Sequence, residues 1–346
     1  MFIAIHAGAG YHSPKNTPKY KKLMSEVCLK SMDYLKKGNS SLDTIKYCIG
    51  LLETNELTNA GISGSNLTIS GSVECDASLM TADGFASVGA VPMLSEEKIH
   101  PSPIGIAHKL YLNLMNGVDV AGRQPPLMLA GREAHQFAES LGLTMITKAE
   151  ANSLITTGQK KRYEHHMDIL KRATKIKTGR DYLQDTVGAI VVDAQGNMVT
   201  GVSSGGISLK VPGRIGEAGY PGSGIWIIEE DETTIACTLS GTGEQIMKTF
   251  LATSISNILI NSVDLPGDLE TLLIEKFLKA KVLAKEQIDK NVGALIVRKA
   301  SDNIECWWGH TTPSFCLAFV NENSKVTFRM SRKNSGRRVC VGGTSM

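Results

Sequence analysis

The chain of 346 residues is long enough for one large α/β domain or two ordinary ones, with ample apolar content for a core. Its hydrophobic content of 42% and charged content of 21% are typical of a soluble globular enzyme, and a formal net charge of +3 is too small to indicate nucleic-acid binding. Seven scattered cysteines without C-x-x-C spacing indicate free thiols in a reducing compartment, so a cytoplasmic or nuclear location is expected.

The first half is predicted to begin with a strand that two helices follow. Residues 2–5 are apolar, but this run is too short for a signal peptide, and no run approaches the length of a membrane span. Glycine, serine and threonine dominate residues 59–89, where loops and short strands such as 67–69 are expected to line a site. Apolar residues at helical spacing predict helices over 19–37, 41–52, 104–115 and 133–141.

The second half is predicted to hold strands with two helices between them. Helical spacing recurs over 243–259 and 269–284, and Trp307 and Trp308 are interpreted as packing at a strand edge. Strands at both ends of each half, with helix pairs between them, indicate sheets packed together and covered by helices. The β-type runs are 186–190, 197–202, 224–228, 292–297, 315–320 and 325–330.

A basic stretch separates the two halves. Lysines and arginines are dense over residues 160–180, which predicts an exposed linker over about 156–184. A nuclear-import or nucleic-acid role is the open alternative, because clustered basic residues serve either purpose. His165 and His166 are expected to be solvated, since no carboxylate or cysteine completes a set of metal ligands around them.

The segment Asp185-Thr186-Val187-Gly188-Ala189-Ile190 places a threonine at the start of an apolar run, directly behind an acidic residue. If the bond between Asp185 and Thr186 is cut, Thr186 gains a free α-amine beside its own hydroxyl, which unites a nucleophile and a base in one residue. An α-amine titrates at about pH 8, close to where a general base works best at neutral pH. The alternative is a plain turn that leads into a buried strand.

Further motifs follow one another in an order that a single turn does not explain. They are His6 to Ser13, Thr58-Asn59-Ala60-Gly61, Glu74-Cys75-Asp76-Ala77-Ser78, Ser203-Ser204-Gly205-Gly206, Lys210-Val211-Pro212-Gly213-Arg214-Ile215-Gly216-Glu217, Ser240-Gly241-Thr242-Gly243-Glu244 and His310-Thr311-Thr312. With Thr186 they resemble the threonine-nucleophile branch of the N-terminal-nucleophile (Ntn) hydrolases, the family of plant-type asparaginases and aspartylglucosaminidases. Within it the chain most resembles the threonine aspartases (taspases), endopeptidases that cut after aspartate.

This resemblance implies one Ntn-hydrolase domain over residues 1–346, an αββα four-layer sandwich. It implies self-cleavage between Asp185 and Thr186, which gives an α subunit of residues 1–185 and a β subunit of residues 186–346. The αβ units are expected to pair into a homo-oligomer. Substrates are expected to be aspartate-containing proteins or peptides, with no cofactor, metal, membrane or nucleic acid.

The resemblance also implies roles for residues of the site. Thr186 is the nucleophile and Ser204 orients it, while Ser240 and the N–H of Gly241 form the oxyanion hole. Asn59 supports the same region, with Gly8 and Gly10 in a loop beneath it. Glycine lets the backbone approach a ligand closely.

Substrate binding is expected to depend on Arg214, whose planar guanidinium can hold a carboxylate in two parallel hydrogen bonds. Lys210 either adds charge nearby or is an exposed lysine. Glu217 stands where asparaginases of the family carry Asp for the substrate's α-ammonium and where threonine aspartases carry a neutral amide. An L-asparaginase or β-aspartyl (isoaspartyl) peptidase is therefore the alternative function, whereas Ser204 and the segment 6–13 favour the aspartase.

Two other interpretations are weaker. The glycine pair after the first strand lacks the third glycine and the acidic partner of a dinucleotide site. A non-enzymatic scaffold that binds partners through the basic linker would never split into two chains. Lone histidines such as His6, His108 and His310 are expected to be structural.

Overall fold

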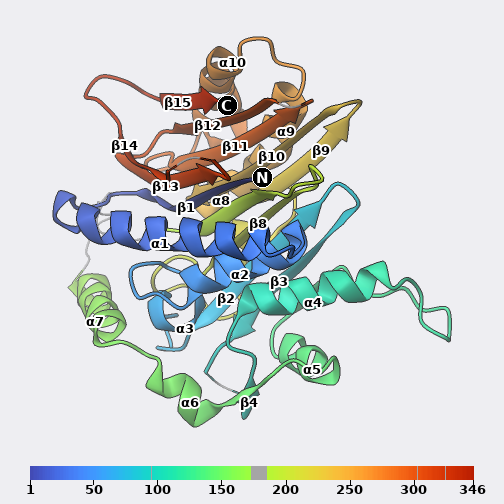
Figure 1. Cartoon of the computed structure of the whole chain (residues 1–346). Helices are drawn as coiled ribbons and strands as arrows, with labels where there is room; N and C mark the ends of the chain where they lie inside the picture. The colour runs from blue at the N-terminus through green and yellow to red at the C-terminus, as the bar shows by residue number, and fades with distance from the viewer. Residues whose placement is uncertain (95, 173–184, 302, 324) are drawn as a thin grey trace.

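The computed structural model describes residues 1–94, 96–172, 185–301, 303–323 and 325–346. They form four layers: two β-sheets lie face to face, and helices cover the outer face of each sheet (Figure 1). Each sheet is apolar on both faces, so each face must be buried against another layer. The αββα order expected from the sequence is confirmed.

The larger sheet has the strand order β14-β13-β1-β7-β8-β2-β3-β5 and is antiparallel except between β3 and β5. It combines strands from before and after residue 185, because β1 lies between β13 and β7. The strands are β1 (Phe2–Gly10), β2 (Glu74–Thr81), β3 (Gly84–Pro92), β5 (Met128–Ala130), β7 (Val187–Val192), β8 (Met198–Ser204), β13 (Ser314–Asn321) and β14 (Thr327–Arg332).

The smaller sheet is antiparallel throughout, in the order β15-β12-β11-β10-β9, and all its strands follow residue 185. They are β9 (Ile225–Glu230), β10 (Thr233–Gly241), β11 (Val292–Ala300), β12 (Asn303–His310) and β15 (Cys340–Ser345). A separate two-stranded ribbon joins β4 (Lys98–Ile99) to β6 (Ile146–Thr147).

Helices α1 (Thr17–Lys36), α2 (Ser41–Glu53) and α4 (Pro103–Met115) pack on the larger sheet, and α9 (Leu251–Leu259) and α10 (Leu265–Leu272) pack on the smaller one. Serine caps fix where two of them begin, because Ser40 accepts a hydrogen bond from the N–H of Asp43 and Ser102 from that of Gly105. The remaining helices are α3 (Gly61–Gly64), α5 (Glu133–Ser140), α6 (Lys148–Ser153), α7 (Thr157–Arg172) and α8 (Gly243–Thr249).

Three apolar clusters fill the spaces between the layers. Ile45 and Leu79 belong to the cluster between the outer helices and the larger sheet. Phe2 and Leu295 belong to the cluster between the sheets, and Leu269 to the one under α9 and α10. The seven cysteines are free thiols, as expected.

Several expected elements differ in the structure. The helix expected over 243–259 breaks at Phe250, which adopts φ 45° and separates α8 from α9. The helix expected over 269–284 begins earlier, at Leu265, and ends in a π-helical turn over Leu273–Leu278. Residues 67–69 form no strand. The two tryptophans lie on β12, which pairs with strands on both sides, so the edge interpretation was wrong.

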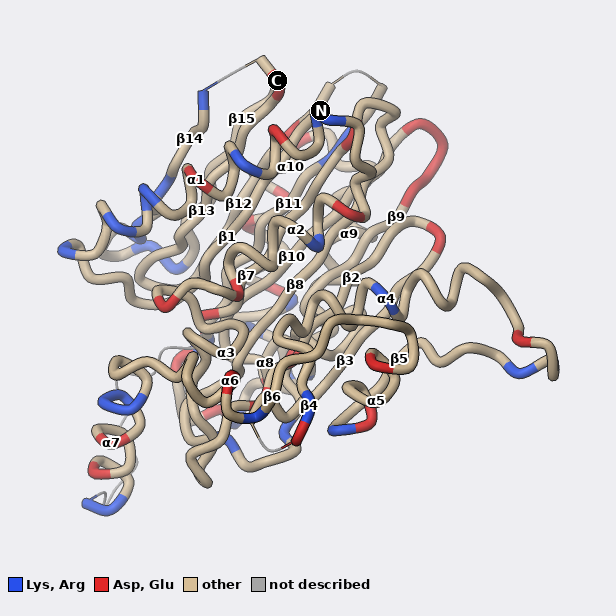
Figure 2. The backbone as a smooth tube through the Cα atoms, turned by 60° about the horizontal axis from the view of Figure 1, so that its bottom comes forward, with Lys and Arg blue, Asp and Glu red and all other residues tan. Residues whose placement is uncertain are grey.

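The expected linker over about 156–184 is in part an ordered helix. Helix α7 lies at the periphery and carries both basic and acidic positions (Figure 2). Gln159 donates to the carbonyls of Ile62 and Ser65, which attaches the helix to the body of the protein. His166 is buried, with Nδ1 2.5 Å from Ser208 Oγ, so its expected solvation was wrong. Residues 173–184, which are the rest of the predicted linker, lie outside the described residues.

Candidate active site

Thr186 lies at the end of the larger sheet, immediately before β7. Strands β7 and β8 are paired so that Val187 faces Ser203, which brings Ser204 beside Thr186. Thr186 Oγ1 lies 3.2 Å from Ser204 Oγ, and both residues are buried. The register of one antiparallel pair therefore places the expected nucleophile beside its expected orienting hydroxyl.

Glu217 makes a shorter contact with the same hydroxyl. Thr186 Oγ1 donates to Glu217 Oε1 at 2.7 Å. Burial raises the pKa of Glu217, and the nearby Arg214 guanidinium and the hydrogen bond from Thr186 partly oppose that rise. The sequence marked Glu217 as an unusual residue of the predicted binding site, but nothing in it indicated a contact with Thr186.

Ser240 lies at the end of β10 and faces Thr186 from the smaller sheet. Its Oγ accepts hydrogen bonds from the N–H of Thr186 at 3.2 Å and from the N–H of Ala9 at 2.9 Å. The next residue, Gly241, has φ 149°, and a Cβ there would lie 2.2 Å from the carbonyl oxygen of Asn291. Only glycine fits this position, which keeps the backbone of β10 open toward the cavity.

A narrow cavity, too small in this structure to hold a water molecule, adjoins Thr186. Its lining combines the expected nucleophile with expected binding residues, and it also includes Ile207, which the sequence did not single out. The lining residues are Thr186, Ser204, Gly206, Ile207, Arg214, Glu217 and Gly241.

Arg214 turns its guanidinium into this cavity. Nε donates to Glu244 Oε1 at 2.8 Å, while the buried Nη1 and Nη2 have no hydrogen-bond partner within the described part of the chain. Glycines make room for it, because a Cβ at Gly216 would lie 2.4 Å from Nη1 and one at Gly243 2.7 Å from Nη2. Two parallel donors held in a buried pocket suit a carboxylate.

Lys210 is buried, so the alternative of an exposed lysine was wrong. It is 2% exposed, and Nζ donates to the carbonyl of Glu74 at 2.9 Å. A Cβ at Gly206 would lie 3.2 Å from this ammonium and 3.0 Å from Arg214 Nη1. Lys210 therefore adds positive charge beside the guanidinium, although it does not line the cavity.

Asn59 supports the site without contacting Thr186. Its Nδ2 donates to the carbonyl of Gly206 at 2.9 Å, and its own carbonyl accepts from the N–H of Gly205 at 2.7 Å. Its Oδ1 accepts from the N–H of Asn66 at 2.8 Å. These bonds hold the turn that follows Ser204.

Asp185 is buried against β1, where the expected glycine loop is instead a bulge between His6 and Ala9. A Cβ at Gly8 would lie 2.4 Å from the Asp185 side chain, so that side chain occupies the space that Gly8 leaves empty. His12 Nε2 lies 3.8 Å from Asp185 Oδ2. Burial raises the pKa of Asp185, and His12 acts in the opposite direction.

His6 packs behind Thr186, where it is buried. Its Nε2 lies 3.0 Å from Thr238 Oγ1, and burial lowers its pKa to about 3, so the ring is neutral. Asp76, which the sequence placed only within a motif, accepts from the N–H groups of Ala90 at 2.7 Å and Gly216 at 2.9 Å. It thereby fixes the loop that carries Arg214.

Comparison with known proteins identifies the family. A model of the asparaginase family matches residues 1–327. The chain belongs to the asparaginase family. It is an Ntn hydrolase, and the αββα sandwich is the fold of that class.

Individual members of the asparaginase family are similar along most of the chain. The isoaspartyl peptidase/L-asparaginase of Rattus norvegicus is 29% identical over 318 residues, which are 90% of this chain and 85% of the relative. The protein of the same name from Danio rerio is 30% identical over 250 residues, 72% and 73% of the two chains. The plant-type L-asparaginase of Pyrococcus abyssi is 28% identical over 330 residues, 92% and 96%.

These relatives confirm the predicted family, but none of the three is named a threonine aspartase. Among the residues that the structure describes, no helix is both long and apolar enough to cross a membrane.

Proposed function

We propose that this member of the asparaginase family is a self-processing threonine hydrolase that cleaves peptide bonds after aspartate. The observation that carries the proposal is the position of Thr186, whose hydroxyl borders a buried cavity that the Arg214 guanidinium also lines. Nη1 and Nη2 of this guanidinium have no hydrogen-bond partner within the described part of the chain. A nucleophile and a carboxylate-binding group that share one small cavity suit the hydrolysis of an aspartyl derivative.

Self-cleavage comes first. Thr186 Oγ1 attacks the carbonyl carbon of Asp185, its proton passes to the peptide nitrogen, and the C–N bond breaks, which frees the α-amine of Thr186 and leaves an ester. Water then hydrolyses the ester, which frees the hydroxyl of Thr186 and leaves a carboxylate on residue 185. Burial of Asp185 against Gly8 supports this step, because a fixed scissile bond lowers the entropic cost of the attack.

In the mature enzyme the freed amine is the base and Thr186 Oγ1 the nucleophile. Ser204 aligns the hydroxyl, and Ser240 with the N–H of Gly241 stabilises the oxyanion, where each donor contributes about 3 kcal/mol. The acyl-enzyme is then resolved by water. This chemistry requires neither a metal nor a cofactor.

Arg214 would hold the free carboxylate of the substrate. In a peptide cut after aspartate this is the side-chain carboxylate, and in asparagine or an isoaspartyl peptide it is the α-carboxylate. The difference lies in the α-nitrogen, which is an amide in the peptide and an ammonium in the small substrates. An ammonium needs an unengaged acidic partner in the cavity.

Glu217 therefore decides between the two candidates. Its Oε1 already accepts the hydroxyl of Thr186 and its charge lies beside Arg214, which supports peptide cleavage because little of the carboxylate remains for an ammonium. The second candidate, isoaspartyl peptidase/L-asparaginase, is favoured by the names of the relatives and by the acidic character of residue 217. Pairing of αβ units and a cytoplasmic or nuclear location also remain proposals.

Glu217→Gln tests this choice, with the exposed Glu230→Gln as control. Wild type and variants are assayed on a peptide with an internal aspartate, on an isoaspartyl dipeptide and on L-asparagine. We expect Glu217→Gln to retain self-cleavage, since an amide oxygen still accepts the Thr186 hydroxyl. KM for the peptide should fall severalfold, because a negative charge beside the bound carboxylate is removed. If wild type turns over only the small substrates and Glu217→Gln abolishes that activity, the second candidate is correct.

A further inference from the structure

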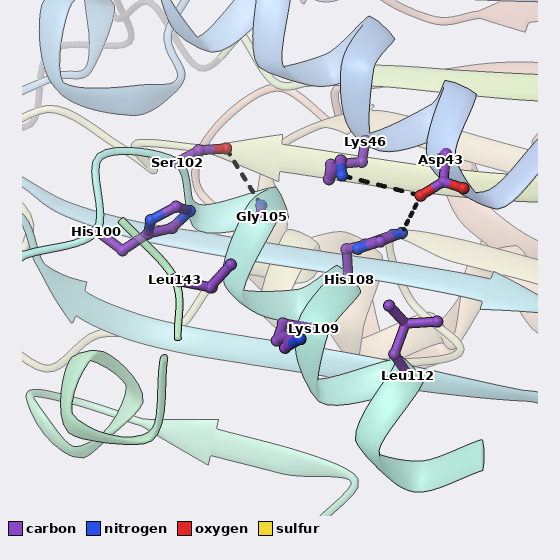
Figure 3. A pocket seen from close by; sticks show the side chains of 9 residues that line it. All are labelled: Asp43, Lys46, His100, Ser102, Gly105, His108, Lys109, Leu112 and Leu143. Atoms are coloured by element: carbon purple, nitrogen blue, oxygen red, sulfur yellow. Dashed lines mark hydrogen bonds and ion pairs between the residues drawn. The ribbon is translucent and has the colours of Figure 1, made fainter. Parts of the chain in front are cut away.

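A second cavity lies on the outer layer of helices, between α2 and α4, and shares no lining residue with the cavity at Thr186 (Figure 3). Its volume is about 480 Å³, which is within the range of small-molecule sites. The processing and hydrolysis proposed above do not use it.

Positive charge exceeds negative charge in the lining of this cavity. Lys46 lies 3.8 Å from Asp43 Oδ1, so these two charges are paired. Asp43 Oδ2 also accepts a hydrogen bond from Ser40 at 2.8 Å. Lys109 lines the same cavity and forms no salt bridge with any residue that the structure describes, which leaves one uncompensated ammonium.

Two histidines line the cavity between these charges. His108 Nε2 lies 3.2 Å from Asp43 Oδ1, and burial lowers the pKa of His108 to about 4. His100 Nδ1 donates to the carbonyl of Thr144 at 2.9 Å, and burial lowers its pKa too. Both rings are therefore neutral at pH 7, and the net charge of the lining comes from Lys46, Lys109 and Asp43.

The remaining part of the lining consists of Ser102, Gly105 and two leucines. Leu112 of α4 and Leu143 flank Lys109 in the view of Figure 3. A ligand that matches this lining carries an acidic group toward the lysines and an apolar body toward the leucines. We propose that the cavity between α2 and α4 is a binding site for a small organic anion of this kind.

The test uses phenyl phosphate, which joins an anionic group to an apolar ring, and the intact protein. Histidine signals in NMR spectra report on this cavity separately from the Arg214 cavity, and spectra of His100→Gln and His108→Gln assign them. Phenyl phosphate should shift the signals of His100 and His108 in a saturable manner. Benzyl alcohol, which has the ring without the charge, should not.

Two substitutions change the charge in opposite directions. Lys109→Met keeps the length of the side chain and should weaken the affinity for phenyl phosphate roughly fivefold, whereas the isosteric Asp43→Asn should raise it roughly threefold. Lys22→Met on the exposed face of α1 is the matched control and should bind as wild type does.

The proposal is overturned if phenyl phosphate leaves the signals of His100 and His108 in place at millimolar concentrations. It is equally overturned if benzyl alcohol shifts them as strongly, or if Lys109→Met and Asp43→Asn bind like Lys22→Met. Opposite changes in affinity for the two cavity variants support it, because misfolding would weaken binding in both.

Discussion

The two sheets of this protein differ in where their strands come from. The smaller sheet is built entirely from strands that follow Thr186. The larger sheet alternates between the two sides of the proposed cut, with β1 paired to β13 and β7, and β2 paired to β8. The proposed cut therefore lies beside the strand pairs that join the two chains within the larger sheet. We call these pairs, β1 with β13, β1 with β7 and β2 with β8, the seam.

The seam explains why cleavage need not separate the halves. The hydrogen bonds of three strand pairs and the apolar cluster under α1, α2 and α4 join residues from both sides. The seam also supplies the site, because Asp185 and Gly8 come from one side and Thr186, Ser204 and Ser240 from the other. The smaller sheet contributes Ser240, although all its strand pairs join residues that follow the cut.

Among changes next to the seam, removal of the Thr186 hydroxyl should have the largest effect on self-cleavage. Thr186→Ala lacks the hydroxyl that attacks Asp185, so we expect no self-cleavage and no turnover. Thr186→Ser retains the hydroxyl and should process more slowly, because it lacks the methyl group that restricts χ1. Intact-mass measurement distinguishes one chain from two. A Thr186→Ala protein that still splits before residue 186 would refute the assignment.

A methyl group added to Gly8 on β1 should have the next largest effect on self-cleavage. Gly8→Ala puts a Cβ within 2.4 Å of the Asp185 side chain, so Asp185 must move and self-cleavage should nearly stop. Gly38→Ala is the control, because Gly38 also has a positive φ but nothing lies within 4 Å of the added Cβ. Both variants should lose about 1 kcal/mol of stability to backbone strain. Equal processing in the two would show that the position of Asp185 is unimportant.

Two largely buried arginines give the third comparison: Arg214 in the loop after β8 and Arg298 on β11. Arg214→Leu should lower kcat/KM for aspartyl substrates about 100-fold, because a paired, charge-assisted contact with the carboxylate is lost. Arg298→Leu is matched in burial, with a side chain 14% exposed against 13% for Arg214, but its partner is Glu305 in the smaller sheet. It should affect stability and leave kcat/KM unchanged. A similar loss of activity in both variants would move the carboxylate site elsewhere.

Sequence patterns predicted the parts of this molecule that depend on local periodicity or on register. Short β-type runs predicted β7 and β8, and their pairing alone brings Ser204 to Thr186. Contacts between side chains that are far apart in the sequence were not predictable. The contact of Glu217 with Thr186 and the burial of Lys210 depend on loops that the larger sheet positions.

Breaks in regular structure were also missed. An αL residue at Phe250 leaves the apolar period of a helix intact in the sequence, so one long helix was expected. Helix α7 was interpreted as solvated because its charges dominate its composition, although Gln159 and His166 anchor one face.

Glu53 offers the most specific test of the seam. It lies on α2 before the proposed cut, and its Oε1 accepts from the hydroxyl of Ser203, which follows the cut, at 2.6 Å and from the N–H of Ile104 at 3.0 Å. Burial raises its pKa to about 7 from the ordinary 4.5. The folded protein thus holds this proton up to about pH 7, whereas the unfolded chain releases it near pH 4.5.

The stabilising contribution of the Glu53 carboxyl is therefore complete below pH 4.5 and is lost as the pH rises through 7, a change of about 3 kcal/mol. Glu53→Gln cannot ionise, so its unfolding free energy should fall less steeply over this range than that of wild type. Denaturant unfolding at several pH values measures the difference, with the exposed Glu26→Gln as control. Parallel curves for wild type and Glu53→Gln would mean that the carboxyl across the seam stays ionised. Stability of the seam would then not depend on its protonation.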